Sequence, residues 1–401
     1  MTMRTKRESW IFVLTVLSAA ASLVSIAASE ILLALACLLW IAIRPRPFLI
    51  PAYALPLTAF MLTTVLSWVM SPDPSIGAAP VRKFVLFSMG LLASNFVTDV
   101  WRVKLAYRVL LITAAIGSVV ALVQFGLNER RYLASGLLAD DPMAIDRVKG
   151  FMGHWMTFSG GQLLIWCAVI PLIVLIGRRW IIPLLLVGVA LIFSYTRSAW
   201  LGAAAGIASV AFWIPRKQLV RILVPIIAAG LLASPLIYHR IALSAGGGFG
   251  PDYGRVELLR VGVELVRAHP LFGVGLNRIH DEFPKYYRGD NLETFFYGHL
   301  HNNFMQIAAE RGLLCLTAFL WFLGTLYRSF WRFLKSGNEA LRLTALSAVS
   351  ALTGFLVMGL FEFNFGDSEP LILFLFIVSI PFGIDGMMKH QRTPSIPAGS
   401  K

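Results

Sequence analysis

Long apolar stretches separated by short polar segments make up most of this 401-residue chain. Many of the stretches approach or exceed about 18 residues, the length of helix that crosses the hydrocarbon core of a bilayer. The pattern therefore predicts an all-α membrane protein with about twelve spanning helices, of which the second is short. The expected spans are 10–28, 30–43, 49–70, 83–98, 105–126, 157–176, 180–196, 198–214, 219–238, 302–326, 343–363 and 369–387.

Two polar segments interrupt this pattern and divide the chain into three expected parts. The shorter segment lies at about 127–156 and the longer one at about 239–300. We expect membrane helices one to nine, with the shorter polar segment, in residues 1–238. A loop domain is expected in 239–300, followed by helices ten to twelve and a tail in 301–401.

The longer polar segment begins with the glycine-rich run Ala245–Gly250 and then predicts a helix from Arg255 to about Ala268. Gly254 is the expected N-cap of this helix, and Pro270 ends it. Its apolar residues fall on one side, which could rest on the bilayer or on the helix bundle: Val256, Leu259, Val263 and Val266.

Composition agrees with a membrane protein. Hydrophobic residues make up 57% of the chain and charged residues 14%, whereas soluble domains contain roughly 25% charged residues. The basic N-terminus and the apolar run after it also resemble a secretory signal peptide. A second apolar run follows Ser29 and Glu30 without a polar mature domain, so a retained first helix is expected.

The placement of lysine and arginine predicts the orientation. Cytoplasmic loops are rich in these residues, and most of the 35 lysines and arginines fall in inner segments if the N-terminus lies inside. An even number of spans then puts both termini in the cytoplasm. The remaining basic residues and six of the seven histidines, all except His390, face outward. Such an outer face suits an anion such as phosphate or pyrophosphate.

Several basic residues on the expected outer face are candidate anion ligands. Arg197 lies between two spans with almost no loop, where a charge is costly unless it is paired or faces water. It is either an interfacial arginine beside Trp200 or a ligand at the floor of an outward-facing cavity. The same alternatives, contact with solvent or headgroups and contact with an anionic substrate, apply to Arg255 and to Arg82 with Lys83.

His301 lies where the long polar loop meets the tenth span. The positive end of the helix dipole favours a neutral imidazole there, and a neutral imidazole can accept a proton as a general base. His299 could take the same role, and an interfacial histidine bonded to a carbonyl or a headgroup is the alternative. Glu362 and Asp367, near the outer end of the eleventh span, could orient His301 or pair with an arginine. No metal-ligand spacing occurs, so neither a metal nor a cofactor is expected.

Four motifs together resemble the O-antigen ligase and polymerase superfamily. Each motif is loose by itself, but their order, spacing and common outer location make the set specific. They are Arg147-Val-Lys-Gly-Phe-Met-Gly-His154, Tyr195-Thr-Arg197-Ser-Ala-Trp200, the helix from Arg255 with His269-Pro270-Leu271-Phe272-Gly273-Val274-Gly275, and His301-Asn302-Asn303-Phe304-Met305-Gln306 with Glu310-Arg311-Gly312-Leu313.

The resemblance implies a GT-C-like membrane glycosyltransferase with a large, partly helical periplasmic loop between helices nine and ten. Such an enzyme of the bacterial inner membrane would transfer a glycan from undecaprenyl pyrophosphate to a sugar hydroxyl of lipid A–core, with inversion and without a metal. His301 would be the general base, and Arg197 and Arg255 would bind the pyrophosphate. Supporting roles would fall to Arg82, Lys83, Arg147, Asn302, His299 and Asp367.

Three other functions are alternatives to the ligase function that the resemblance implies. An O-antigen polymerase would use a second lipid-linked glycan as acceptor, and a protein O-oligosaccharyltransferase would use a serine or threonine. The latter often has a longer C-terminal region than the short tail Lys389–Lys401, which favours the ligase. A lipid-linked glycan transporter would also suit twelve spans, but transporters commonly show two related halves, and here the large loop is expected outside, between helices nine and ten.

Overall fold

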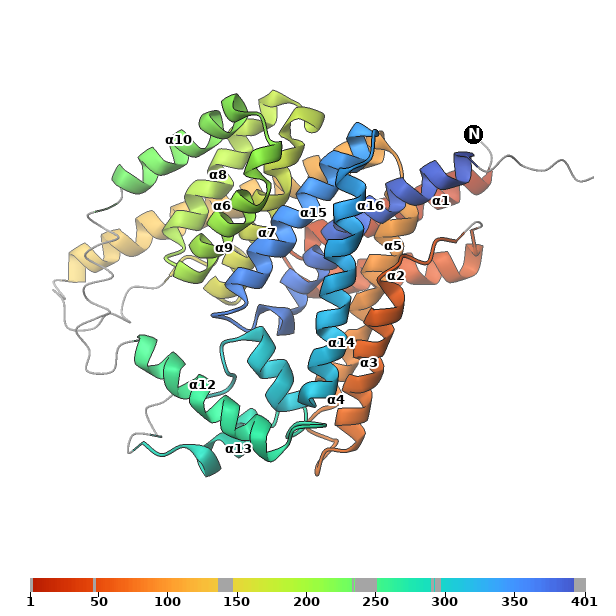
Figure 1. The fold of residues 1–401 in the computed structure, drawn as a ribbon. Coiled ribbons are helices and arrows are strands. Elements are labelled where there is room, and N and C mark those ends of the chain that lie inside the picture. The colour runs from red at the N-terminus through yellow and green to blue at the C-terminus, as the bar shows by residue number, and fades with distance from the viewer. Residues whose placement is uncertain are drawn as a thin grey trace, which may run out of the picture.

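The computed structural model describes residues 3–45, 48–135, 147–232, 234, 251–289, 292 and 297–392. All regular secondary structure in these residues is helical (Figure 1), which confirms the expected all-α class. The glycine-rich run Ala245–Gly250 lies outside the described residues. The bundle helices are α1 (Met3–Ala21), α2 (Ile26–Ile43), α3 (Ala54–Val69), α5 (Ser88–Phe96), α6 (Val100–Ser135), α7 (Trp155–Ile176), α8 (Ile181–Phe193), α9 (Arg197–Val210), α10 (Arg216–Leu232), α14 (Asn303–Leu334), α15 (Glu339–Met358) and α16 (Ser368–Arg392).

Short helical pieces connect the bundle helices. The expected span at 83–98 is divided in two, because one 3-10 turn over residues 83–87 precedes α5. The connecting pieces are α4 (Ala78–Arg82) and the 3-10 turns η1 (Lys83–Phe87), η2 (Arg178–Trp180), η3 (Ala211–Trp213) and η5 (Asn364–Gly366).

Among the described residues, six helices are long and apolar enough to cross a membrane: α2, α6, α7, α14, α15 and α16. Glu8–Ala21 and α3 are apolar but shorter. With 13 and 14 residues, α8 and α9 measure only about 20 Å, against a hydrocarbon core of roughly 30 Å. The protein is thus a multi-pass helical protein, and the count of twelve spans stays a prediction.

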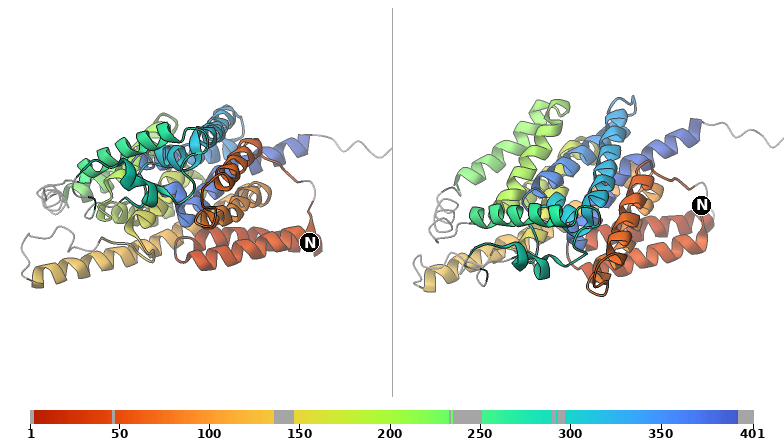
Figure 2. Two further views of the ribbon diagram at one scale, coloured as in Figure 1. Left: turned by 90° about the horizontal axis from the view of Figure 1, so that it is seen from below. Right: turned by 60° about the horizontal axis from the view of Figure 1, so that its bottom comes forward.

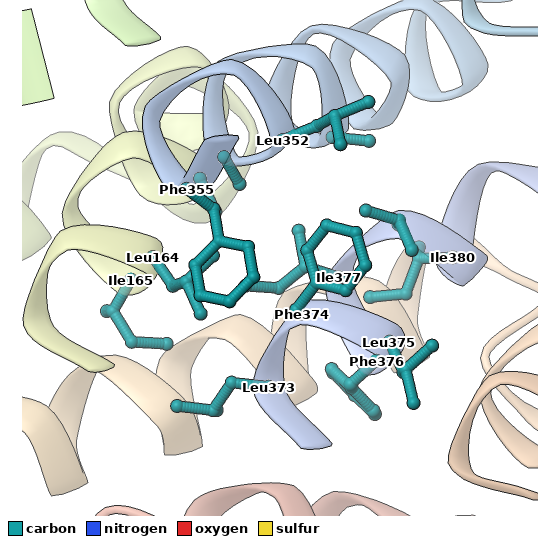
Figure 3. Packing of buried hydrophobic residues seen from close by; sticks show 14 of the residues in the cluster. Leu164, Ile165, Leu352, Phe355, Leu373, Phe374, Leu375, Phe376, Ile377 and Ile380 are labelled. Atoms are coloured by element: carbon teal, nitrogen blue, oxygen red, sulfur yellow. The ribbon is translucent and has the colours of Figure 1, made fainter. Parts of the chain in front are cut away.

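Helices α7 and α16 form the centre of the bundle. The apolar window of α7 is 89% buried and that of α16 is 78% buried, whereas that of α2 is 17% buried. Phe374 of α16 stacks on Phe355 of α15, with ring centroids 5.0 Å apart, and Leu164 of α7 lies beside them (Figure 3). α2 therefore presents most of its surface outward.

Small residues bring α9 and α15 into close contact. A Cβ atom on Gly206 would lie 2.6 Å from the Ser350 carbonyl oxygen, and one on Gly202 would lie 2.5 Å from that of Gly354. Two glycines at i and i+4 allow this approach of two helix backbones. The contact fixes the position of α9, and hence of Arg197 at its first turn.

Two loop helices, α12 (Pro251–Ala268) and α13 (Ile279–Tyr286), lie together at one end of the bundle, below it in Figure 1 and toward the viewer when the molecule is seen from below (Figure 2, left). We call this end the loop end. These helices share a separate apolar cluster that includes Leu258, Val261 and Phe283.

The loop helix differs from expectation at its start and in its buried face. It begins at Pro251, a residue suited to the first helical position, so the prediction of Gly254 as N-cap was wrong. Because Leu258 and Val261 turn toward α13, the buried side is not the one predicted. Val256 is 67% exposed and Leu259 is 38% exposed, so contact of that side with a bilayer stays a prediction.

Candidate functional site

A break in α14 holds the loop against the bundle. Gly312 has φ 81° and ψ 170° inside the helix, and a Cβ atom there would overlap the backbone of Leu271. The chain after α12 enters this break. The Leu313 N–H donates to the Pro270 carbonyl at 2.8 Å, and the Val274 and Gly275 N–H groups donate to the carbonyls of residues 309 and 310 at 2.9 and 3.0 Å.

Glu310 and Ser67 complete this attachment. The buried Glu310 carboxylate accepts from the Asn277 N–H at 2.9 Å. The Ser67 hydroxyl of α3 donates to the Phe272 carbonyl at 2.6 Å and lies 3.2 Å from that of Glu310. The sequence Glu310-Arg311-Gly312 is thus a docking point for the segment that follows α12.

Amide side chains at the start of α14 bind it to the end of α15. Asn302 caps α14 by accepting from the Met305 N–H at 2.9 Å, and its amide donates to the Leu360 carbonyl at 3.0 Å. Asn303 is fully buried and donates to the Asn364 side chain at 2.6 Å. These bonds fix the residue just before them, His301.

His301, Glu362 and Arg255 form one linked group. The Nδ1 atom of His301 lies 3.0 Å from Oε2 of Glu362, and Nη2 of Arg255 lies 3.2 Å from Oε1 of the same carboxylate. Glu362 is only 3% exposed, whereas the side chains of His301 and Arg255 are 16% and 28% exposed. One buried carboxylate therefore joins a histidine from the α14 entry to an arginine from the loop helix.

His301 also has an unusual backbone. Its φ of 47° places it in the left-handed region, which costs a residue with a Cβ atom roughly 1–2 kcal/mol. Packing around the Asn302 cap and the Glu362 contact maintain this conformation. Strain of this kind is typical of functional positions.

Two further histidines lie close to His301. The ring centroids of His299 and His301 are 4.1 Å apart, and burial lowers the pKa of His299 to about 3, with His301 and His154 acting in the same direction. His154 caps α7, accepting from the Met156 N–H at 3.2 Å. Burial also lowers the pKa of His154, while the Glu362 carboxylate raises it. Both His299 and His154 are therefore neutral near pH 7.

The start of α7 connects this group to the hairpin that carries Arg197. Thr157 donates to Asp367 at 3.1 Å, and Ser159, two residues later, lies 2.8 Å from the Thr196 hydroxyl. Arg197 follows as the first residue of α9, with an exposed side chain. α7 therefore contacts both the acidic turn after α15 and the arginine hairpin.

Burial raises the pKa of Asp367 to about 6, although the hydrogen bond from Thr157 opposes this effect. The Lys83 ammonium donates to the neighbouring Gly366 carbonyl at 2.6 Å. Arg147 lies over the ring of Trp155, with its guanidinium carbon 5.2 Å from the centroid. Arg82 is exposed at the end of α4. Of these four residues, Asp367 ends the turn that follows Glu362, and Lys83 contacts that turn.

Residues 182–320 match the family model described as O-antigen ligase. This part of the chain is therefore similar to the O-antigen ligase superfamily. A comparison with curated proteins finds no match. Members of the superfamily are glycosyltransferase-like enzymes of the inner membrane.

The O-antigen ligase match contains Arg197, Arg255 and His301, whereas Glu362 lies beyond it. From the sequence, both Glu362 and Asp367 could orient His301, but only Asp367 was expected among the supporting residues. In the structure Glu362 contacts His301, and Asp367 accepts from Thr157 instead. His154 was not predicted as a site residue, although it ends one of the four motifs. Within the described residues, no three His, Cys, Asp or Glu side chains gather as a metal site would require.

Proposed function

We propose that this protein is an O-antigen ligase, which transfers a glycan from undecaprenyl pyrophosphate to a sugar hydroxyl of lipid A–core. The observation that carries the proposal is the buried carboxylate of Glu362, which contacts both His301 and Arg255. Glycosyl transfer from a pyrophosphate needs a proton acceptor and fixed positive charge close together, and this arrangement supplies both.

His301 is the proposed general base. With Glu362 accepting from the Nδ1–H group, the lone pair of the neutral imidazole lies on Nε2. As the acceptor oxygen bonds to the anomeric carbon, its proton passes to Nε2. The Glu362 carboxylate then stabilises the imidazolium ion, as an aspartate does in a Ser-His-Asp triad.

Arg197 and Arg255 are the proposed pyrophosphate ligands. When the bond between the anomeric carbon and the pyrophosphate oxygen breaks, its electron pair stays on that oxygen. Guanidinium groups neutralise the resulting charge without protonating it, and charges fixed in advance are a large catalytic contribution. Arg255 has five N–H donors, so its contact with Glu362 leaves others for phosphate oxygens. Attack opposite to the leaving group inverts the anomeric centre.

The remaining predicted residues have supporting roles in the proposal. Asn302 holds the backbone of His301, and His299 packs as a neutral ring beside it. Arg147, Arg82 and Lys83 add positive charge for phosphates of the donor or the acceptor. The loop end faces the periplasm in this proposal, and both termini lie in the cytoplasm.

One assay distinguishes the candidate functions. Purified protein in detergent is given an undecaprenyl-pyrophosphate-linked glycan together with lipid A–core, a second lipid-linked glycan or a peptide. We expect transfer to lipid A–core. Transfer to the second lipid-linked glycan would instead identify a polymerase, and transfer to the peptide a protein O-oligosaccharyltransferase. Absence of transfer to all three acceptors would contradict the proposal that the protein is an enzyme.

Variants test the assigned roles within the same assay and in cells. His301→Ala is expected to abolish transfer without loss of folding, leaving core lipopolysaccharide with no O-antigen ladder on a gel. A normal ladder from this variant would exclude His301 as the base. Arg197→Lys and Arg255→Lys keep the charge but lose the planar donor fork, and full activity of both variants would argue against specific pyrophosphate recognition.

A further inference from the structure

A cavity of about 460 Å³ lies where the start of α1, the end of α5 and the end of α16 meet. This is the side of the bundle away from α12 and α13 (Figure 1). Its volume is in the range of small-molecule sites, roughly 300–1,000 Å³. The first turn of α6 and the connection between α2 and α3 complete its lining, which mixes charged and apolar side chains. The group around Glu362 contributes none of these residues, so the cavity is separate from the proposed catalytic centre.

The walls of the cavity are held in place by close packing and by hydrogen bonds. A Cβ atom on Gly383 of α16 would lie 2.8 Å from the Ser94 carbonyl oxygen, and one on Gly386 would lie 2.8 Å from the Leu49 side chain. Asn95 of α5 accepts from the Leu49 N–H at 2.7 Å and donates to the Leu49 carbonyl at 2.9 Å. The cavity is therefore a consequence of how these segments pack.

Arg102 of α6 brings a guanidinium group to the cavity, and three contacts fix its position. Its Nη1 atom donates to the Phe96 carbonyl at 2.9 Å, its Nε atom lies 3.3 Å from the Asp99 carboxylate, and its guanidinium carbon lies 5.2 Å from the Phe12 ring centroid. Because arginine has five N–H donors, these contacts leave the donors of Nη2 for a ligand. A guanidinium fixed in this way suits the oxygen atoms of a phosphate group.

Two carboxylates line the same cavity. Asp99 caps α6 by accepting from the Arg102 N–H at 2.9 Å, and its side chain is 49% exposed. Glu8 lines the cavity from α1. A carboxylate has about four lone-pair sites, so Asp99 can accept further hydrogen bonds. The cavity also includes Lys389, whose ammonium lies 2.6 Å from the Asp385 carboxylate. Groups of both signs therefore lie together, which favours a zwitterionic ligand over a purely anionic one.

Exposed tryptophans beside the cavity indicate that it opens at the membrane–water interface. Trp10, two residues after Glu8, is 62% exposed, and Trp101, next to Arg102, is 65% exposed. Tryptophan is enriched where lipid headgroups meet the hydrocarbon core. Apolar side chains suited to the glycerol and the first acyl carbons of a lipid also line the cavity: Phe48, Leu49, Phe96 and Met387.

We infer that this cavity binds the headgroup of phosphatidylethanolamine, with the phosphate at Arg102 and the ammonium at Asp99 and Glu8. The inference goes beyond the proposed function and does not depend on it. The primary ammonium of this lipid has three N–H donors, as a lysine ammonium does, and carboxylates accept from them. Phosphatidylcholine has a methylated ammonium without N–H donors. Phosphatidylglycerol has no cation, so its phosphate would approach two carboxylates without compensation.

Lipid affinity tests the inference directly. Native mass spectrometry of the purified full-length protein gives Kd for phosphatidylethanolamine, phosphatidylcholine and phosphatidylglycerol with identical acyl chains. We expect Kd for phosphatidylethanolamine to be lower than the other two values by about tenfold or more, because only this headgroup makes charge-assisted hydrogen bonds with both signs of charge. Equal Kd values for the three lipids, or tightest binding of phosphatidylglycerol, would overturn the inference.

Two variants assign the headgroup to the cavity. Glu8→Gln combined with Asp99→Asn removes both carboxylates and keeps the α6 cap, since asparagine caps helices as well as aspartate does. The preference for phosphatidylethanolamine over phosphatidylcholine should fall to less than about twofold, and Asp99→Asn alone should give an intermediate value. Arg102→Gln should instead weaken binding of both lipids by about tenfold and leave their ratio unchanged, because both contain the phosphate.

Matched controls remove the same charges from α15. Glu339 in its first turn and Arg342 are exposed and do not line the cavity, so Glu339→Gln and Arg342→Gln should keep the wild-type Kd values. A preference for phosphatidylethanolamine that survives the loss of both Glu8 and Asp99 carboxylates would place the lipid elsewhere and reject the site. The measurement contains no glycan substrate, so its result is independent of whether the protein is a ligase.

Discussion

Glu362 is the residue on which the proposed chemistry depends most. Its carboxylate is 3% exposed and contacts two ionisable side chains from distant parts of the chain. A buried carboxylate that keeps its charge needs such partners. It therefore orients the imidazole of His301 and compensates part of the charge on Arg255, before any substrate binds.

Replacement of Glu362 by glutamine tests this role. Glu362→Gln keeps the shape and a hydrogen-bond acceptor but removes the charge that stabilises the imidazolium ion. We expect kcat for glycan transfer to fall by about 100-fold or more. Glu264→Gln is the control, since Glu264 pairs with Arg267 on the exposed side of α12. Wild-type kcat in Glu362→Gln would show that the carboxylate is not coupled to proton transfer.

The left-handed backbone conformation of His301 allows a test that distinguishes a chemical role of its imidazole from a structural one. Asparagine adopts this conformation more easily than histidine or alanine. His301→Asn should therefore abolish transfer while its thermal stability in detergent equals or exceeds that of His301→Ala, by up to about 1 kcal/mol. If His301→Asn unfolds at a lower temperature than His301→Ala, this would indicate that the imidazole mainly stabilises the fold.

At the scale of helices, close contacts between small residues determine where the site lies. Gly202 and Gly206 let α9 approach α15, and α15 ends beside Glu362. The same contact thus sets the position of Arg197 relative to the carboxylate turn. The break at Gly312 likewise determines the position of the loop helix that carries Arg255.

A single methyl group tests the contact between α9 and α15. Gly202→Ala should destabilise the protein by about 1–3 kcal/mol, because the added Cβ atom forces two helix backbones apart. Gly324→Ala on α14 is the control: no atom lies within 4 Å of its added Cβ, and alanine favours a helix by about 1 kcal/mol. Thermal unfolding in detergent compares the two variants, and equal stability would contradict the packing argument.

Sequence pattern predicted the helices better than their irregularities. A helix covers most of each expected span, because apolar composition is a local property of the chain. The division of 78–96 into three pieces and the break at Gly312 were not predicted. The break is held by hydrogen bonds in which the Pro270 carbonyl accepts from the Leu313 N–H and the Val274 N–H donates to the carbonyl of residue 309. A contact between separate segments leaves no periodic pattern in the sequence of either one.

At the scale of the whole molecule, the site draws on segments from most of the chain. His301 and Arg255 were recognisable from motifs. The pairing of His301 with Glu362 was not, because it spans 61 residues and follows from how α14 packs on α15. His154 was missed as a site residue because its proximity to Glu362 comes from the position of α7 in the bundle.

The predicted orientation of the molecule is open to a direct test. In a background with Cys37→Ser, since Cys167 and Cys315 are buried, single cysteines replace His280 on the loop helix α13 and Lys389 near the end of α16. Their side chains are 68% and 75% exposed. A membrane-impermeant maleimide should label His280→Cys in cells with a permeabilised outer membrane, and Lys389→Cys only after lysis. Labelling of both from one side would refute the proposed topology.

The attachment of Ser67 has a consequence for biosynthesis. Its two acceptor carbonyls lie 205 and 243 residues further along the chain, and the second belongs to the helix that is broken at Gly312. Synthesis proceeds from the N-terminus at about 5–20 residues per second, so α3 waits many seconds in the membrane before either acceptor exists. The segment after α12 is likewise complete before the carbonyls of α14 that hold it. The proposed catalytic centre is therefore assembled only when the last quarter of the chain has been made and inserted.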